Sequence, residues 1–271
     1  MLRVFAVSGD ELASLPAEDF ADVQALKNHL KGLCGLPRFR QQLLCGGEVL
    51  EDKVKLESAM DLQLVLLPLS SPSAADRARL VAAAGSGTAS EVDRLLRRPQ
   101  DPDLTEKEGQ GPSPLVAASR HGHVDIVQLL LEAGARKEIP AIRTPICEAA
   151  AMGHLEVVRV LMEVRASLDN DSDGACLPGR ATPLFLAAKA GHAPVVHELL
   201  KARANVGGFT LHEAVRGGHT TIVGELLESG APAEPLLLAE AQVHGHNEIF
   251  QLLMERISSS GMGLGPGRAS Y

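Results

Sequence analysis

The segment Ser113–Leu130, SPLVAASRHGHVDIVQLL, contains the pattern that decides the fold. Its Gly-His pair recurs along the chain, and each copy is followed by an apolar stretch that ends in Leu or Met. A period of about 33 residues is typical of stacked structural repeats, which cannot bury their apolar faces singly. We therefore expect an extended binding surface rather than a catalytic pocket. The copies of the pair are Gly122-His123, Gly153-His154, Gly191-His192, Gly218-His219 and Gly245-His246.

Several copies begin and end with residues suited to a short helix. Ser113, Thr144 and Thr182 can cap a helix, and the proline that follows each of them occupies a position where no amide donor is needed. Small Ala side chains keep the first helix slim, and the Gly of each pair can end it in a left-handed conformation. Helices shorter than about 12 residues are marginal in water, so neighbouring copies must stabilise one another.

These segments strongly resemble ankyrin repeats. A degenerate first copy from Arg77 to about Arg98 and a last copy from Leu236 to Arg256 bring the prediction to about six repeats, an all-α solenoid over residues 77–256. The resemblance implies that exposed residues of the array bind a protein client. It rests on SPLVAA at Ser113, TPICEA at Thr144, TPLFLA at Thr182 and FTLHEA at Phe209.

The composition agrees with a helical repeat protein. Of the 271 residues, 45% are hydrophobic but only 3% are aromatic, so the core must be built mainly from Ala, Leu, Val and Ile. The formal net charge of −8 argues against nucleic acid as a partner, because nucleic-acid binders normally carry a basic face that neutralises phosphates.

The sequence also indicates where the protein resides. The longest uninterrupted apolar stretch, Leu64–Leu69, is far shorter than the roughly 20 residues that span a bilayer. The apolar run at the N-terminus is cut by Asp10 and Glu11, so no signal peptide is expected. Four cysteines without a CxxC pair fit a reducing compartment. We expect a soluble monomer in the cytoplasm, with the nucleus as the alternative, and no membrane partner.

The first 69 residues have a different pattern. Ser8-Gly9-Asp10 is a turn between two apolar stretches, which predicts a β-hairpin. Apolar residues at helical spacing follow Asp22, a suitable N-cap, and Gly35 stands after the last of them. The predicted elements are, in order, strands at 2–7 and 12–16, a helix at 22–33, and strands at 42–45 and 62–67.

This region resembles ubiquitin through LPRFRQQLLCGGEVLED, which begins at Leu36, and DLQLVLLPL, which begins at Asp61. The match covers Met1 to about Leu69 and implies a β-grasp fold. By this resemblance, the apolar patch that contacts ubiquitin receptors maps onto Val7, Leu44 and Val65. The alternative is that each is an ordinary exposed apolar residue. No Gly-Gly tail follows Leu69, so we expect a fixed ubiquitin mimic rather than a conjugated modifier.

An acidic segment lies where the spacing of the glycine turns predicts an extended loop, at about 167–181. Asp169, Asp171 and Asp173 alternate before Gly174, as at the start of an EF-hand calcium loop. Arg180 stands at the twelfth position, where calcium binding requires a bidentate Glu. We therefore favour a solvated acidic loop and assign these three aspartates to partner binding.

Two other patterns suggest chemistry but have simpler explanations. The pairs His121 with His123 and His244 with His246 could indicate a transition metal, yet both straddle the repeat turn, where hydrogen bonding is the preferred role. Cys147 could be a thiol nucleophile, but its position inside a packed helix favours a small buried side chain. We expect no metal and no cofactor.

Together these observations predict a two-domain adaptor or scaffold that is not an enzyme. The ubiquitin-like domain docks a receptor-type partner, while the ankyrin repeats hold a protein client. A ubiquitin–proteasome shuttle, a calcium-responsive regulator and a cryptic thiol enzyme remain as alternatives. The expected boundaries are 1–69 for the ubiquitin-like domain, 70–76 for a linker, 77–256 for the repeats and 257–271 for a disordered tail.

Overall fold

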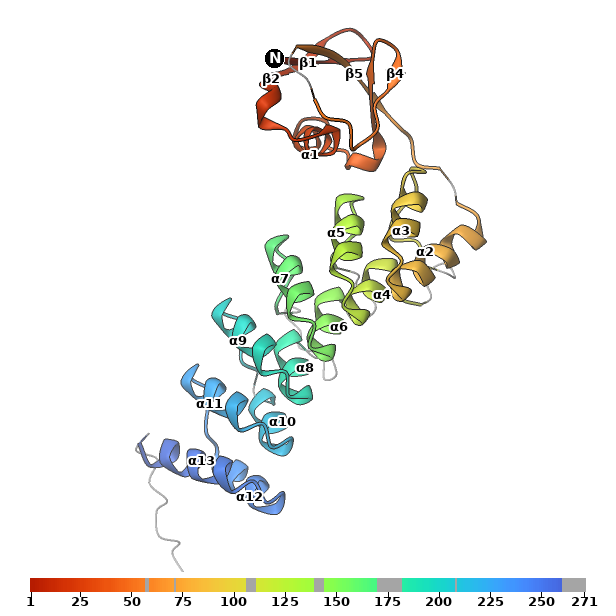
Figure 1. Cartoon of the computed structure of the whole chain (residues 1–271). Helices are drawn as coiled ribbons and strands as arrows, with labels where there is room; N and C mark the ends of the chain where they lie inside the picture. The colour runs from red at the N-terminus through yellow and green to blue at the C-terminus, as the bar shows by residue number, and fades with distance from the viewer. Residues whose placement is uncertain are drawn as a thin grey trace, which may run out of the picture. The chain divides into compact units, whose positions relative to one another are not determined.

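The computed structural model divides into two compact units. One comprises Met1–Ala118 and His123–Lys137, and the other comprises Ser119–Gly122 and Glu138–Tyr271. The first unit contains an α+β domain and the helices that follow it, and the second contains the remaining helices (Figure 1). The structure describes residues 1–56, 59–70, 72–105, 111–138, 144–169, 182–207 and 209–259.

The N-terminal domain is a mixed five-stranded sheet with one helix, α1, against it (Figure 1). The strand order is β2-β1-β5-β3-β4, in which β1 and β5 are parallel and the other neighbours are antiparallel. This architecture is compatible with the predicted ubiquitin-like β-grasp. The elements are β1 (Leu2–Ala6), β2 (Glu11–Leu15), α1 (Val23–Cys34), β3 (Gln41–Cys45), β4 (Glu48–Val49) and β5 (Met60–Leu66), with single 3₁₀ turns at Ala17–Asp19 and Arg38–Arg40.

Alternation along the strands builds the core of this domain. Successive strand residues point to opposite faces, so alternate apolar residues of β1 and β5 pack toward α1. Helix α1 begins where Asp22 Oδ1 accepts a hydrogen bond from the Ala25 amide at 2.9 Å, and Gly35 ends it with φ +70°. The core consists of Leu2, Val4, Val23, Leu26, Leu30, Leu43, Leu62 and Leu64.

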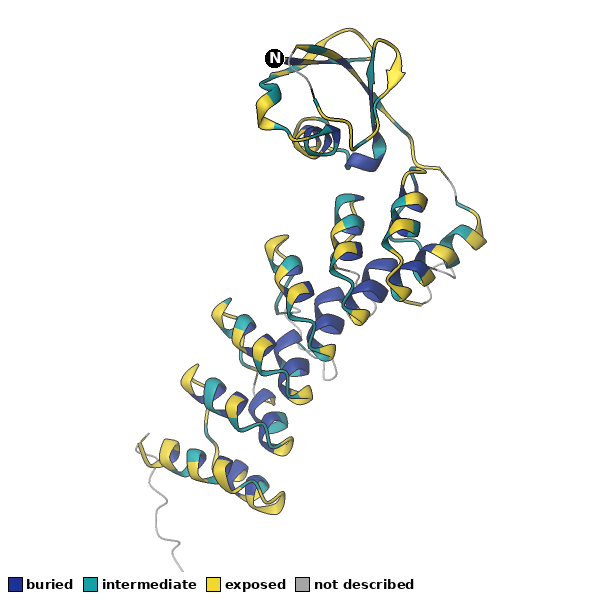
Figure 2. Ribbon diagram, viewed as in Figure 1, coloured by how far each residue is buried: buried dark blue, intermediate teal, exposed yellow. Residues whose placement is uncertain are grey.

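Six helix pairs follow within the described residues, which agrees with the predicted number of repeats. The first helices α4, α6 and α8 have eight residues each and contain several Ala, and Figure 2 shows them mostly buried. The pairs are α2 (Ala74–Ser86) with α3 (Ala89–Leu96), α4 (Pro114–His121) with α5 (Val124–Glu132), α6 (Pro145–Met152) with α7 (Leu155–Glu163), α8 (Pro183–Ala190) with α9 (Ala193–Lys201), α10 (Thr210–Arg216) with α11 (Thr220–Glu228), and α12 (Pro235–Val243) with α13 (Asn247–Ser259).

The helical region is longer than the sequence predicted at both ends. Helix α2 begins at Ala74, inside the expected linker 70–76, because the Ser73 hydroxyl caps it by accepting from the Asp76 amide at 3.1 Å. Helix α13 continues to Ser259, beyond the expected end at Arg256.

The predicted helix starts and stops are confirmed. The hydroxyls of Thr144 and Thr182 accept from the amides of Cys147 and Phe185 at 3.4 and 3.1 Å, and the prolines occupy the first helical turn. Gly153 then ends α6 with φ +77°, a backbone conformation that side chains with a Cβ rarely adopt.

The histidine of each Gly-His pair binds the preceding repeat. His154 Nε2 lies 3.0 Å from the Arg120 carbonyl, and its ring fills the place where a Cβ on Gly122 would stand. In the first four pairs the glycine also acts across a repeat boundary, since it leaves room for the imidazole of the next repeat. The same contact to a backbone carbonyl joins His123 to Gly85, His192 to Ala151, His219 to Lys189 and His246 to Arg216.

Candidate protein-interaction surfaces

Two residues of the predicted apolar patch, Leu44 and Val65, share one face of the N-terminal sheet. In the register of β3 with β5, Gln42 pairs with Val65 and Leu44 pairs with Gln63, so Leu44 and Val65 are diagonal neighbours. Leu43, between Gln42 and Leu44, is in the core, which places Leu44 on the outer face. Leu44 and Val65 are half-buried, and Val7, just after β1, is 65% exposed. The structure brings Leu44 and Val65 together on the face of the sheet opposite the core, and Val7 is exposed directly after β1.

The sequence analysis missed a fourth member of this group. Val49 of β4 pairs directly with Leu44, so the two side chains lie on the same face, and Val49 is exposed. Its position after the turn Gly46-Gly47 could have indicated this, because a two-residue hairpin fixes the register of the strands on either side. We call Val7, Leu44, Val49 and Val65 the apolar patch.

A charged pair borders the apolar patch on the same face of the sheet. Arg3 of β1 and Asp61 of β5 are register partners, and their side chains form two hydrogen bonds of 2.8 Å. Both side chains are exposed, so the pair contributes little to stability. A partner with an apolar centre and a polar margin would match this face.

The repeats carry a second set of exposed apolar residues. Phe209, which precedes α10, is 74% exposed, and Leu236 and Val243 of α12 are also exposed. Nearby, Lys189 of α8 forms an ion pair of 3.2 Å with Glu213 of α10. Sequence reasoning did not single out Phe209, although a large aromatic residue at a helix start, where other copies have Ser or Thr, was a visible signal.

Aspartate and glutamate side chains at the repeat ends bind the backbone of the next repeat. Asp103 accepts from the Arg136 amide at 2.9 Å, and Glu138 accepts from the Ser167 amide at 3.1 Å. The side chain of Asp103 is nearly buried, and desolvation raises its pKa even though Arg136 opposes the shift.

The same arrangement accounts for the first residue of the predicted acidic loop. Asp169 Oδ1 accepts from the Asn205 amide at 2.8 Å, so this carboxylate joins two repeats. Asp171 and Asp173, with Gly174 and Arg180, lie outside the described residues. In the part of the chain that the structure describes, no group of three or more His, Cys, Asp or Glu side chains could hold a metal ion.

The structure places Cys147 inside helix α6. Its side chain is only 2% exposed, which fits the predicted role as a small packed residue. His121 and His244 do not join a ligand cluster within the described ranges, and the ring of His244 stacks on that of His246 with 6.0 Å between the centroids.

Comparison with known proteins identifies the repeats. The family model described as "Ankyrin repeats (3 copies)" matches residues 80–173 and 166–237, more than half of the chain. The chain belongs to the ankyrin-repeat family. No curated protein sequence matches it significantly.

Two solved structures of ankyrin-repeat domains are similar to the chain. The human ASB11 ankyrin repeat domain is 25% identical with a TM-score of 0.57, and the match covers 70% of this chain and 86% of that domain. An ankyrin repeat domain from Acinetobacter baumannii AYE is 26% identical with a TM-score of 0.55, and the match covers 65% of this chain and 96% of that domain. The ankyrin repeats are therefore a protein–protein interaction module.

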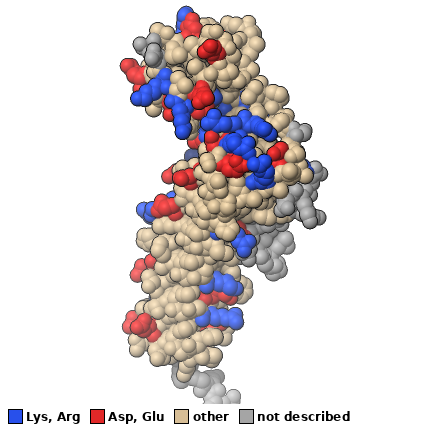
Figure 3. Space-filling model, turned by 45° about the vertical axis from the view of Figure 1, so that its right-hand side comes forward, with Lys and Arg blue, Asp and Glu red and all other residues tan. Residues whose placement is uncertain are grey.

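The surface charge of this ankyrin-repeat protein is mixed. On the face shown in Figure 3, Lys and Arg side chains lie beside Asp and Glu side chains. Glu91 of α3 is an example, because hydrogen bonding from Arg94, followed by the charges of Arg94 and Arg79, lowers its pKa to about 2. None of the described helices is long and apolar enough to cross a membrane.

Proposed function

We propose that this ankyrin-repeat protein is a non-catalytic adaptor. The repeats hold a client protein, and the N-terminal domain, acting as a fixed ubiquitin mimic, binds a ubiquitin-receptor-type partner through the apolar patch. The observation that supports the proposal is that Leu44 and Val65 are neighbours on the outer face of the sheet, with Val7 exposed just after β1. Exposed apolar groups with polar margins are typical of surfaces that bind other proteins.

The buried position of Cys147 and the carbonyl-bound histidines support a role without catalysis. A thiol nucleophile must reach its substrate, whereas Cys147 is packed within α6. The imidazoles of His123, His154 and His192 are bound to backbone carbonyls of the preceding repeats, which gives them a structural role.

The receptor-binding part of the proposal is tested by replacing one residue of the patch. Leu44→Glu places a charge in the centre of the apolar patch, whereas Leu33→Glu places the same charge on an exposed residue of α1, away from the patch. The probe is a set of immobilised ubiquitin-binding domains, and the full chain is applied in solution.

We expect at least one ubiquitin-binding domain to retain the original protein and the Leu33→Glu variant. Leu44→Glu should weaken this binding at least about tenfold, since burying one Leu side chain contributes about 1.5–3 kcal/mol. Circular dichroism of both variants controls for folding. If no domain in the set binds the original protein, or if Leu44→Glu binds equally well, the receptor role is rejected.

A further inference from the structure

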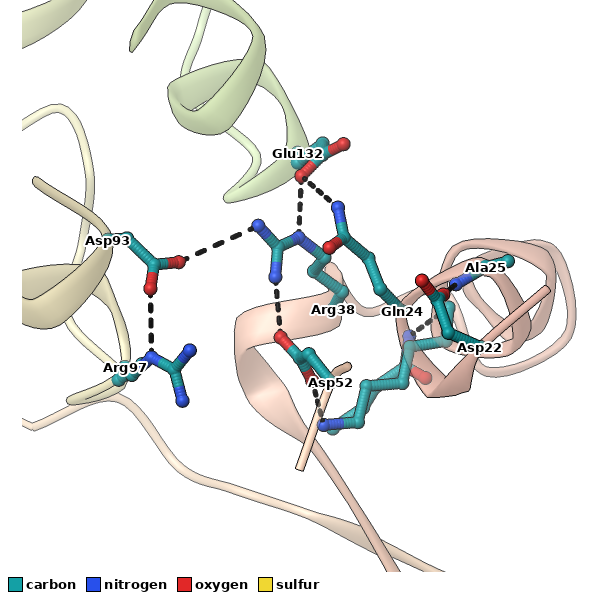
Figure 4. Close-up of polar contacts among 10 residues, drawn as sticks. Asp22, Gln24, Ala25, Arg38, Asp52, Asp93, Arg97 and Glu132 are labelled. Atoms are coloured by element: carbon teal, nitrogen blue, oxygen red, sulfur yellow. Dashed lines mark hydrogen bonds and ion pairs between the residues drawn. The ribbon is translucent and has the colours of Figure 1, made fainter. Parts of the chain in front are cut away.

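Arg38 is the most buried cation of the N-terminal domain and lies among carboxylates from three places in the first unit. Its side chain is 2% exposed. Nη1 donates to Asp52 Oδ2 at 2.6 Å within the same domain, whereas Nε donates to Glu132 Oε2 of α5 at 2.6 Å. Nη2 lies 3.9 Å from Asp93 Oδ1 of α3 (Figure 4). Two of the three carboxylates therefore belong to the first two ankyrin repeats.

The charges around Arg38 are balanced. Lys27 binds the other oxygen of Asp52 at 2.7 Å, and Arg97 binds Asp93 at 2.9 Å (Figure 4). Three cations thus face three carboxylates, which is the condition under which buried charges are tolerated. The hydrogen bond that Arg97 donates to Asp93 raises the pKa of Arg97, and the negative charge of Asp52, from the N-terminal domain, adds to this shift.

The position of Arg38 also suits the helices that it contacts. Glu132 is the last residue of α5, and Asp93 lies in the last turn of α3. Carboxylates are unfavourable at helix C-termini, where the helix dipole is negative, and a cation is favourable there. Arg38 therefore offsets the unfavourable position of Glu132 at the end of α5, and it adds to Arg97 in neutralising Asp93.

Two contacts outside the charge cluster join the same parts of the chain. Pro37 packs against Gly134, where an added Cβ would lie 3.3 Å from Pro37 Cγ. Ser70 binds the Pro99 carbonyl through its amide and its hydroxyl, at 2.6 and 2.8 Å. The N-terminal domain thus meets the repeats at Arg38, at Pro37 and at Ser70.

We propose that the Arg38 cluster is an intramolecular docking site that holds the N-terminal domain on the first two repeats as one rigid body. Lys27, Arg38 and Asp52 form one surface of the N-terminal domain. The acidic pair Asp93 and Glu132 of the repeats occupies this surface. An outside partner cannot use that surface while the domain is docked, so the uncovered sheet face with Leu44 is left for binding. This docking does not depend on the proposed receptor role.

The test measures whether the N-terminal domain tumbles together with the repeats. Nuclear magnetic relaxation of backbone amides in the full chain gives a rotational correlation time for residues of β1–β5 and for residues of α2–α5. The decisive variant is Asp93→Asn with Glu132→Gln, which removes both repeat carboxylates without altering the N-terminal domain. Arg3→Met, which removes an exposed ion pair on the outer sheet face, is the matched control.

We expect equal correlation times for the two groups of amides in the original protein and in Arg3→Met. In the double variant the correlation time of the N-terminal domain should fall clearly below that of the repeats, as for a domain that moves on a linker. Unequal times in the original protein would overturn the proposal, and so would a double variant that tumbles as one body.

Discussion

Nε of Arg38 donates a hydrogen bond of 2.6 Å to Oε2 of Glu132, although the two residues lie 94 positions apart in the sequence. One residue belongs to the N-terminal sheet domain and the other ends the second helix of an ankyrin repeat. Because a buried charge is tolerated only with its partners in place, this contact makes the stability of the two parts interdependent.

Arg38→Met should lower the free energy of unfolding by about 3–5 kcal/mol, because Asp52 and Glu132 would lose the buried cation that binds both of them. Arg3→Met removes only an exposed ion pair and should cost less than about 1 kcal/mol. Urea denaturation followed by circular dichroism measures both changes. Equal effects of the two substitutions would show that the Arg38 cluster does not stabilise the fold.

Gly153→Ala should destabilise the repeats by about 2 kcal/mol or more. The residue has φ +77°, which costs a residue with a Cβ about 1–2 kcal/mol, and the new methyl group would lie 2.7 Å from Nδ1 of His192. The predicted effect is a lower melting temperature in calorimetry.

Gly224→Ala is the control, and its expected effect on stability has the opposite sign. Gly224 lies inside α11, and beyond the backbone of that helix no atom of the described residues lies within 4 Å of an added Cβ, so Ala should stabilise the protein by about 0.5–1 kcal/mol. If both substitutions had the same effect, the close packing of His192 on Gly153 would not matter for stability.

The free energy of unfolding of the Asp103→Asn variant should rise relative to that of the original protein as the pH rises above about 4. Desolvation raises the pKa of Asp103 in the folded state. At pH values between the pKa in the unfolded state and the pKa in the folded state, the folded state therefore binds more protons than the unfolded state. Ionisation of Asp103 in that window therefore costs stability, whereas Asn keeps an oxygen that can accept from the Arg136 amide. The measurement is urea unfolding of both proteins at a series of pH values.

Glu91→Gln should show the reverse dependence. Hydrogen bonding from Arg94 lowers the folded pKa of Glu91 to about 2, so its contribution is present above the unfolded pKa of about 4.5 and is lost as the pH falls toward 2. The stability difference between the original protein and Glu91→Gln should therefore shrink on acidification. A difference that stays constant with pH would contradict the assigned cause of either shift.

Cys147 should resist alkylation in the folded protein. Its side chain is 2% exposed, whereas Cys45 is half-buried at the end of β3, so iodoacetamide should modify Cys45 first. Mass spectrometry of peptides resolves the two sites, and both should react at similar rates in urea. Rapid modification of Cys147 in the native protein would revive the alternative of a thiol enzyme.

The repeats could be predicted from the sequence because their signals are local. A capping Thr, the proline after it and the closing Gly act within one helix, so Thr144 to Gly153 already specifies a short helix and its two ends. The histidines were assigned to hydrogen bonding at the turn, but the accepting carbonyl, such as Arg120 for His154, belongs to the preceding repeat. The sequence pattern of one repeat cannot identify a hydrogen-bond partner that lies in another repeat.

The Arg38 contact could not be predicted, because nothing near Arg38 in the sequence specifies Glu132 or Asp93. Charged residues are usually solvated, and the pairing follows only from the packing of the first unit. The patch was partly predictable, since alternation along β3 and β5 places Leu44 and Val65 on one face once the register is known. The position of Val49 on that face could be known only from the pairing of β4 with β3, in which Val49 is opposite Leu44.

An adaptor must bind different partners through separate surfaces. The most direct measurement is quantitative cross-linking mass spectrometry in cells that express the full chain, Leu44→Glu, Phe209→Glu or the control Leu33→Glu. We predict that Leu44→Glu loses one set of partners and Phe209→Glu loses another, while the control loses neither. Loss of the same partners in both variants, or of none in either, would contradict the claim.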